Sequence, residues 1–163
     1  MSAEGVSVDV AAYATALADG IEVALPSWVE RVVAEIMTAW TGSVPPEVAD
    51  AAQAAGHEAA AMVGPRVRAL LESDIDEQRT TPLAILRGAA VAYPSGVLQA
   101  AGVPPVVRDA AAEELFPDDV YDLVPASFAD VAPDLADLGL YWGAAKAFEH
   151  KRRHQPKTSG GNR

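Results

Sequence analysis

The sequence contains no cysteine, few aromatic residues and few basic residues outside its C-terminal end. The absence of cysteine excludes disulfides, thiolate catalysis and cysteine-ligated zinc. Although half of the residues are hydrophobic, no apolar run approaches the roughly 20 residues that a membrane-spanning helix needs. Residues 1–10 carry acids and no basic residue, which does not fit a secretory signal peptide. By elimination we expect a cytoplasmic protein without a membrane partner.

Motifs of the common enzyme classes are also missing. The sequence has neither G-x-S-x-G nor S-x-x-K, which surround catalytic serines, and neither of the glycine-rich patterns that cradle phosphates. His57 precedes Glu58 and His150 follows Glu149, so neither pair has the E-x-x-H spacing of helical metal ligands. A lone catalytic His57 assisted by an aspartate stays open as an alternative to a surface histidine. The sequence predicts no catalytic residue, no cofactor and no metal site.

The charge of the chain is divided between an acidic body and a basic end. Residues 1–145 hold six basic and 22 acidic residues, whereas residues 146–163 hold six basic and one acidic, for a net charge of −11. The acidic body would repel phosphates, which argues against a nucleic-acid partner. Nucleic-acid contact therefore remains a hypothesis only for Lys151, Arg152 and Arg153, and a solvated tail is the simpler interpretation of the basic end.

Composition points to helices. Alanine is the most frequent residue and the best helix former, while runs of β-branched residues are nearly absent. Breaker residues interrupt the helical patterns, notably at Gly20, Gly64-Pro65, Pro94 and Pro104-Pro105. The sequence thus predicts a single compact all-α domain of about six or seven short, proline-punctuated helices with an ordered acidic loop, and not a regular four-helix bundle.

The predicted domain covers residues 8–150, between a flexible N-terminus, 1–7, and a disordered basic tail, 151–163. The expected helices, with a further short helix at 96–101, cover residues 9–19, 25–40, 47–63, 65–72, 82–93, 104–115 and 134–154. Ser27 and Glu30 match a capping box, and Thr81 is the expected N-cap of the helix that starts at 82. The predicted inward faces include Trp40 and Met62.

The most distinctive stretch is residues 115–133, L-F-P-D-D-V-Y-D-L-V-P-A-S-F-A-D-V-A-P, which gathers aspartates, prolines and aromatics between helical segments. Pro117 followed by Asp118 and Asp119 is typical of a helix start, where aspartates cap the first turn. On a helical turn Asp119 and Asp122 would share a face, and paired carboxylates can bind Mg²⁺ or act as acid and base. Capping explains the aspartates without a function and is the preferred interpretation. Ser127 is expected to be a cap or turn residue.

Two arginines lie on otherwise apolar helix patterns near this stretch. Arg87 follows Ile85-Leu86 and Arg108 follows Val106-Val107, and an arginine in such a setting is usually paired with a carboxylate. One interpretation is a clasp, in which both arginines bind loop aspartates and hold the loop to the helices. The other is an anion pocket, where the arginines converge with Lys146. The clasp is preferred because buried charges are seldom unpaired.

Four segments of the sequence resemble other proteins: T-T-P-L-A-I-L-R-G-A, A-Y-P-S-G-V-L-Q-A-A-G-V-P-P-V-V-R-D, F-P-D-D-V-Y-D-L-V-P-A-S-F-A-D-V and W-G-A-A-K-A. Together they cover roughly residues 70–153 and resemble a group of small, uncharacterised alanine-rich proteins from high-GC actinobacteria. No activity is assigned to that group, so the resemblance implies a source and no mechanism.

The sequence favours a non-enzymatic cytoplasmic binding or regulatory protein that engages a protein partner through the acidic loop and exposed edge aromatics, such as Trp28 or Trp142. The alternative is a small ligand-binding protein or enzyme with an Arg/Asp-lined pocket for an anion or a divalent metal. The candidate binding residues are Arg87, Arg108, Asp118, Asp119, Tyr121, Asp122, Trp142 and Lys146.

Overall fold

The computed structural model describes residues 10–73, 81–125 and 127–153, and every regular element among them is a helix. The predicted all-α class is confirmed. Residues 1–7 and most of the predicted basic tail lie outside the described residues, and 151–153 belong to the last helix. These ranges contain six helices: α2 (Val10–Thr41), α3 (Pro46–Glu72), α4 (Pro82–Ala100), α5 (Ala110–Leu115), α6 (Phe128–Val131) and α7 (Leu135–Arg153).

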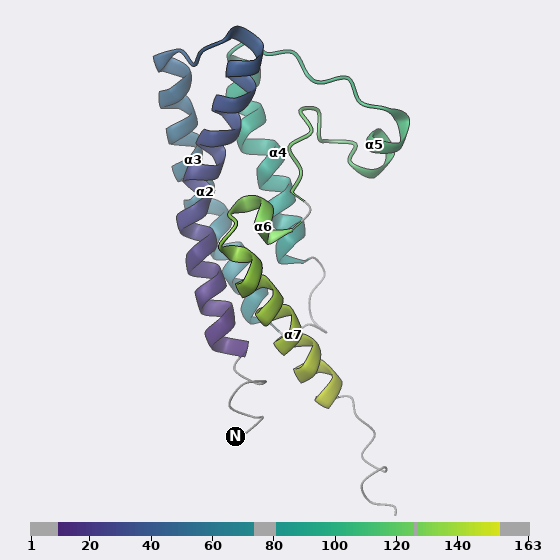
Figure 1. The fold of residues 1–163 in the computed structure, drawn as a ribbon. Helices are drawn as coiled ribbons and strands as arrows, with labels where there is room; N and C mark the ends of the chain where they lie inside the picture. The colour runs from purple at the N-terminus through teal and green to yellow at the C-terminus, as the bar shows by residue number, and fades with distance from the viewer. Residues whose placement is uncertain (1–9, 74–80, 126, 154–163) are drawn as a thin grey trace, which may run out of the picture.

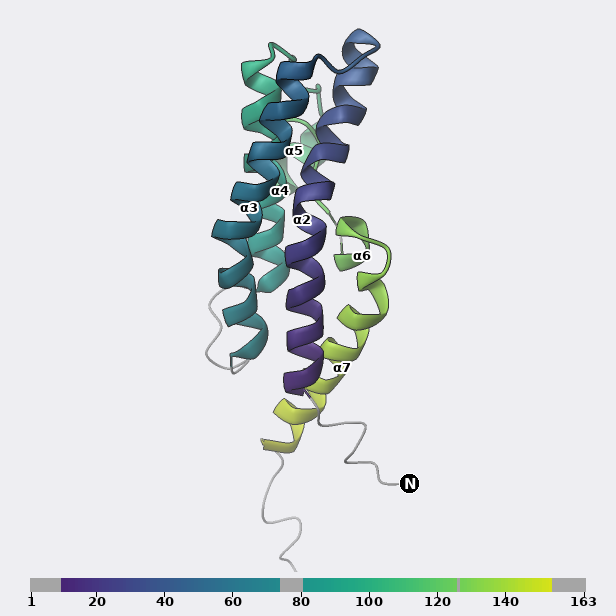
Figure 2. The same cartoon turned by 90° about the vertical axis from the view of Figure 1, so that its left-hand side faces the viewer.

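Four long helices build the body (Figures 1 and 2). The helices α2 and α3 form a long hairpin with the most extensive packing in the molecule, and α4 packs on both of them, mainly on α3. The last helix, α7, lies against the N-terminal half of α2 (Figure 2). Between α4 and α6 the chain leaves the body in a long connector, residues 101–127, which carries α5 (Figure 1).

The predicted end of a helix at Gly20 is wrong, because α2 continues through Gly20 and Pro26. The reason is its buried stripe, which runs on at helical spacing across both residues: Ala14, Leu17, Ala18, Ile21, Leu25, Trp28, Val29, Val33 and Met37. Since Ser27 lies inside this helix, the predicted capping box does not form. Trp40, expected on the buried stripe, is 55% exposed near the end of the helix.

Close packing compensates for the proline in α2. A proline inside a helix removes one hydrogen bond and costs about 3 kcal/mol. At this level α3 presents Gly56, and a Cβ there would lie 2.8 Å from both Cα and the carbonyl oxygen of Pro26. Because Gly56 has no side chain, the backbones of α2 and α3 come into close contact at Pro26, and the two helices stay packed at the level of the proline.

The predicted break at Gly64-Pro65 is also wrong, and α4 likewise runs through Pro94. Both helices bury residues three or four apart on each side of the proline: Val48, Ala52, Gly56, Ala59, Val63, Val67 and Leu71 in α3, and Leu86, Ala90, Pro94 and Leu98 in α4. Burial along the whole hairpin outweighs the local helix-breaking preference. The inward face predicted for residues 47–63 was partly wrong, since Met62 is exposed.

An ion pair network joins the two hairpin helices. The Nη2 atom of Arg68 on α3 lies 2.6 Å from an Asp19 oxygen and 3.0 Å from a Glu22 oxygen, both carboxylates belonging to α2. The hydrogen bonds that Arg68 donates to Glu22, and then those to Asp19, raise the pKa of Arg68 above its ordinary value. The arginine therefore stays charged and helps to fix the register of the hairpin.

Side-chain caps mark the starts of α4 and α5. Thr81 caps α4, since its hydroxyl accepts the Ala84 N–H at 3.0 Å. The predicted last helix, 134–154, corresponds to α7. The helix expected at 104–115 is shortened to α5, because Pro104 and Pro105 favour extended backbone before and at each proline, and Asp109 then caps the chain as α5 begins.

Candidate functional site

Two hydrogen bonds join the outgoing part of the connector, at Val103 and Val106, to its returning part, at Val120 and Tyr121, and we name this junction the neck. The Val106 N–H donates to the Val120 carbonyl at 2.9 Å, and the Tyr121 hydroxyl donates to the Val103 carbonyl at 2.8 Å. Tyr121 is buried, with 3% of its surface exposed. This predicted binding residue therefore holds the outgoing and returning segments of the connector together.

Asp119 organises the turn that follows the neck. Its side chain is 1% exposed, and its two oxygens accept the backbone N–H groups of Leu123 at 2.6 Å and Val124 at 3.0 Å. The predicted helical turn is wrong, so Asp119 and Asp122 do not share a face. Asp122 is exposed and has a φ of 59°, a left-handed conformation that aspartate tolerates better than most residues.

The arginines hold the connector, but through other partners than predicted. The Arg87 Nε–H on α4 donates to the Pro125 carbonyl at 3.2 Å, which fastens the end of the connector to the helix. Arg108 instead pairs with Glu113 of α5 at 3.1 Å, and its side chain is largely covered. Arg87 therefore ties the connector to α4 through a carbonyl oxygen, whereas Arg108 pairs with Glu113 within the connector and not with a loop aspartate as predicted.

Trp142 and Lys146 lie on α7 and contact the C-terminal end of α3. The Trp142 indole N–H donates to the Leu71 carbonyl at 3.0 Å, and the buried Lys146 ammonium donates to the Ser73 carbonyl. These contacts satisfy carbonyls at the C-terminal end of α3, where a positive charge is also favoured by the helix dipole. Lys146 therefore does not converge with the two arginines, and the predicted three-cation pocket is not formed.

The edge aromatics expected to meet a partner are mostly covered. Trp28 is buried and its indole N–H donates to the Asp130 carbonyl at 3.1 Å, while Trp142 is half-buried. Asp130 in turn accepts the N–H of Ser127, the predicted cap residue, which precedes α6. Trp28 and Trp142 thus join elements of the fold and do not form an exposed aromatic patch.

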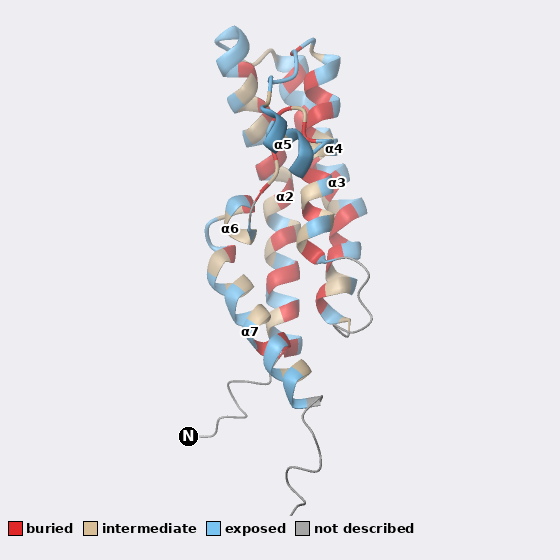
Figure 3. Cartoon of the chain, turned by 90° about the vertical axis from the view of Figure 1, so that its right-hand side faces the viewer, coloured by how far each residue is buried: buried red, intermediate tan, exposed pale blue. Residues whose placement is uncertain are grey.

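Exposed apolar side chains gather instead on the part of the connector beyond the neck, residues 106–118, which we name the excursion. Four of the ten exposed large hydrophobic residues among the described residues lie on it, and Val107 is 95% and Leu115 70% exposed. The helix α5 buries no residue (Figure 3) and stands off the body (Figure 1). No sequence signal distinguishes these side chains from core residues, since they follow the helical apolar pattern of 104–115.

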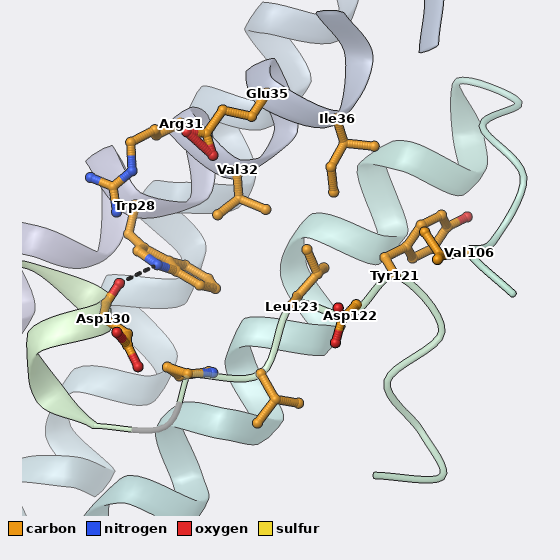
Figure 4. A pocket seen from close by; sticks show the side chains of 12 residues that line it. Trp28, Arg31, Val32, Glu35, Ile36, Val106, Tyr121, Asp122, Leu123 and Asp130 are labelled. Atoms are coloured by element: carbon orange, nitrogen blue, oxygen red, sulfur yellow. Dashed lines mark hydrogen bonds between the residues drawn. The ribbon is translucent and has the colours of Figure 1, made fainter. Parts of the chain in front are cut away.

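An open groove of about 430 Å³ lies beside the neck (Figure 4). One wall is α2, with Arg31, Val32, Glu35 and Ile36, and the other is the connector from Tyr121 to Pro125 together with Val106. Trp28 and Leu123 are buried and form an apolar floor, whereas Glu35, Asp122 and Asp130 are exposed. The groove thus combines an apolar floor with a rim that carries three acids and one arginine.

A smaller pocket of about 340 Å³ lies between α4 and the excursion and is lined by Arg87, Val91, Phe116, Asp118 and Asp119. It brings together three of the predicted site residues. Within the described ranges, however, no group of three or more acidic or histidine side chains is placed to hold a metal ion.

Comparison with protein-family models, curated proteins and solved structures finds no match to this chain. None of the helices in the described part of the chain combines the length and apolar character of a membrane span.

Proposed function

We propose that this chain is a non-enzymatic cytoplasmic binding protein that engages a basic partner protein through the excursion. The observation that carries the proposal is an ordered segment that presents apolar side chains to solvent. Because Val106 and Val120 are hydrogen-bonded at the neck, the residues between them are not needed to connect α4 with α6. A segment that contributes so little burial to the fold is well suited to contact another molecule.

The excursion is held in shape by its own polar contacts. Asp109 accepts the Ala112 N–H at 2.8 Å, Arg108 binds Glu113, and the Phe116 N–H donates to the Ala112 carbonyl at 2.8 Å. An ordered surface loses little conformational entropy when it binds, which favours affinity. The apolar side chains are therefore presented by a preorganised scaffold.

Charge defines the chemistry of the partner. The excursion carries four acidic residues and one arginine, and residues 1–145 as a whole are strongly acidic. Complementary charge accelerates association and disfavours acidic partners. The surface therefore fits a partner whose contact face is apolar at its centre and basic around it.

Affinity capture with purified full-length protein tests this proposal. The test variant is Val107→Ser/Leu115→Ser, which should leave stability within about 0.5 kcal/mol because both side chains are exposed. The matched control is Val23→Ser/Met62→Ser, which alters exposed apolar residues on α2 and α3. We expect wild type and control to recover the same protein, and the test variant to recover at least about tenfold less.

Recovery should also fall as salt rises, since rim charges are screened. If the test variant retains as much of every recovered protein as wild type does, the excursion is not the contact surface and the proposal is wrong.

A further inference from the structure

The groove in Figure 4 is continuous with the excursion, because Val106 belongs both to the neck and to the groove lining. Its floor is provided by buried apolar side chains, among them Trp28 and Leu123. Such a floor suits an apolar side chain of a bound molecule. The groove is open along one side, so it can receive side chains from a segment that continues beyond it.

The rim supplies the second element of recognition. Glu35 extends from α2 and Asp122 from the connector, so the two carboxylates belong to opposite walls (Figure 4). Both are exposed, and neither makes a hydrogen bond or ion pair with any described residue. The rim arginine, Arg31, donates to the Val131 carbonyl at 3.4 Å. The rim therefore presents two carboxylates that a cation can bind.

The connector fixes the position of one of these carboxylates. Asp122 holds a left-handed backbone conformation, and the next two residues are bound by the buried Asp119. The turn is consequently fixed from below while the Asp122 side chain stays at the surface. Because the backbone that carries this carboxylate is already ordered, binding a cation restricts only the side chain of Asp122.

We propose that the groove binds a segment of the basic partner in which an apolar side chain enters the floor and a neighbouring lysine or arginine lies between Glu35 and Asp122. This inference rests on the proposed function, since it assigns one part of the partner's contact face. The charge of the rim and its continuity with the excursion favour a protein segment over a detached small molecule.

Nuclear magnetic resonance of the full-length protein tests the proposal with synthetic peptides. The probe is a short leucine–lysine peptide, compared with a leucine–glutamate and a serine–lysine peptide of the same length. The reporter is the indole N–H signal of Trp28 on the groove floor, and the exposed Trp40 on the same helix is the internal control. We expect only the leucine–lysine peptide to shift the Trp28 signal strongly, with the Trp40 signal unchanged.

The variant Glu35→Gln/Asp122→Asn should bind the leucine–lysine peptide at least about fivefold more weakly at low salt. Asparagine accepts the left-handed conformation at position 122, so the turn should persist. The matched control, Asp50→Asn/Glu58→Gln, removes the same charge from an exposed face of α3 and should bind like wild type.

Four results would overturn the proposal: no Trp28 shift with the leucine–lysine peptide, an equal shift with either comparison peptide, unchanged affinity in the Glu35→Gln/Asp122→Asn variant, or an equal shift with spermidine alone. The last would indicate a site for small cations. Failure of the proposal that the excursion binds the partner can be told apart from failure of the groove proposal, because Val107→Ser/Leu115→Ser leaves the groove intact. If this variant binds the peptide and also recovers as much partner as wild type does, the excursion proposal is wrong while the groove proposal stands.

Discussion

Replacing Asp119 with alanine should destabilise the protein markedly, although the residue lies in a connector. Its carboxylate is 1% exposed and accepts two backbone N–H groups, those of Leu123 and Val124. Hydrogen bonds to a charged group contribute about 1.5–3 kcal/mol each, and alanine leaves both donors without this acceptor. Allowing for partial access of water to the relaxed turn, we expect a loss of about 3 kcal/mol.

The loss should be visible in global unfolding, because Tyr121 and Leu123 belong to the hydrophobic core cluster. For a chain of this size about 3 kcal/mol corresponds to a fall of roughly 6–12 °C in Tm. Urea unfolding followed by circular dichroism measures the free energy, and hydrogen exchange of the Leu123 and Val124 amides locates it. Asp119→Asn keeps one acceptor oxygen and should lose about half as much.

The neighbouring residue provides the control. Asp118 is exposed, and Asp118→Ala should change stability by no more than about 0.5 kcal/mol. If Asp119→Ala loses less than about 1 kcal/mol and the two amides exchange as in wild type, the carboxylate does not organise the turn, and the argument that the groove wall is preorganised fails with it.

Two further substitutions test the packing of the body by urea unfolding. Gly56→Ala should lower the free energy of unfolding by about 1–3 kcal/mol, because the added Cβ would meet the Pro26 backbone at 2.8 Å. The control Gly88→Ala, where an added Cβ meets no atom within 4 Å, should raise it by about 0.5–1 kcal/mol. Equal effects of the two substitutions would refute close contact at the proline. Lys146→Met should lower the free energy of unfolding by about 1–2 kcal/mol, because it removes a buried donor that binds the end of α3. The control Lys151→Met, at an exposed position, should leave stability unchanged. Equal stability of the two variants would exclude the capping role.

The helices could have been predicted more accurately from the same sequence. Leu17, Ile21 and Leu25 continue one stripe across Gly20, and the buried positions of α3 and α4 keep their spacing across Pro65 and Pro94. The predicted helix ends at Gly20, Gly64-Pro65 and Pro94 follow local breaker residues and not this periodicity. A proline costs a fixed amount at one position, whereas a long stripe gains burial over its full length, so the stripe prevails in a packed hairpin.

The partners of the polar residues were predictable only where they are local. Asp119 binds N–H groups four and five residues ahead, which is a turn that its own sequence neighbourhood can suggest. Arg87 reaches a carbonyl 38 residues away, and Lys146 reaches the end of α3, 73 residues earlier. Such partners depend on how the helices pack, and no spacing rule contains that information.

The same dependence on packing explains why residue type misled the choice of binding residues. Residue type favours aspartate, arginine, tryptophan and tyrosine because these side chains dominate binding sites, yet in this fold most of the predicted binding residues satisfy backbone groups. Val107 and Leu115 looked like core residues, but Pro104 and Pro105 keep the preceding chain extended, and the Val106–Val120 bond directs the excursion away from the body. An apolar residue that the backbone holds in solvent gains burial only when another molecule covers it. Exposure on an ordered segment, and not residue type, is therefore the ground on which we propose a contact surface for this protein.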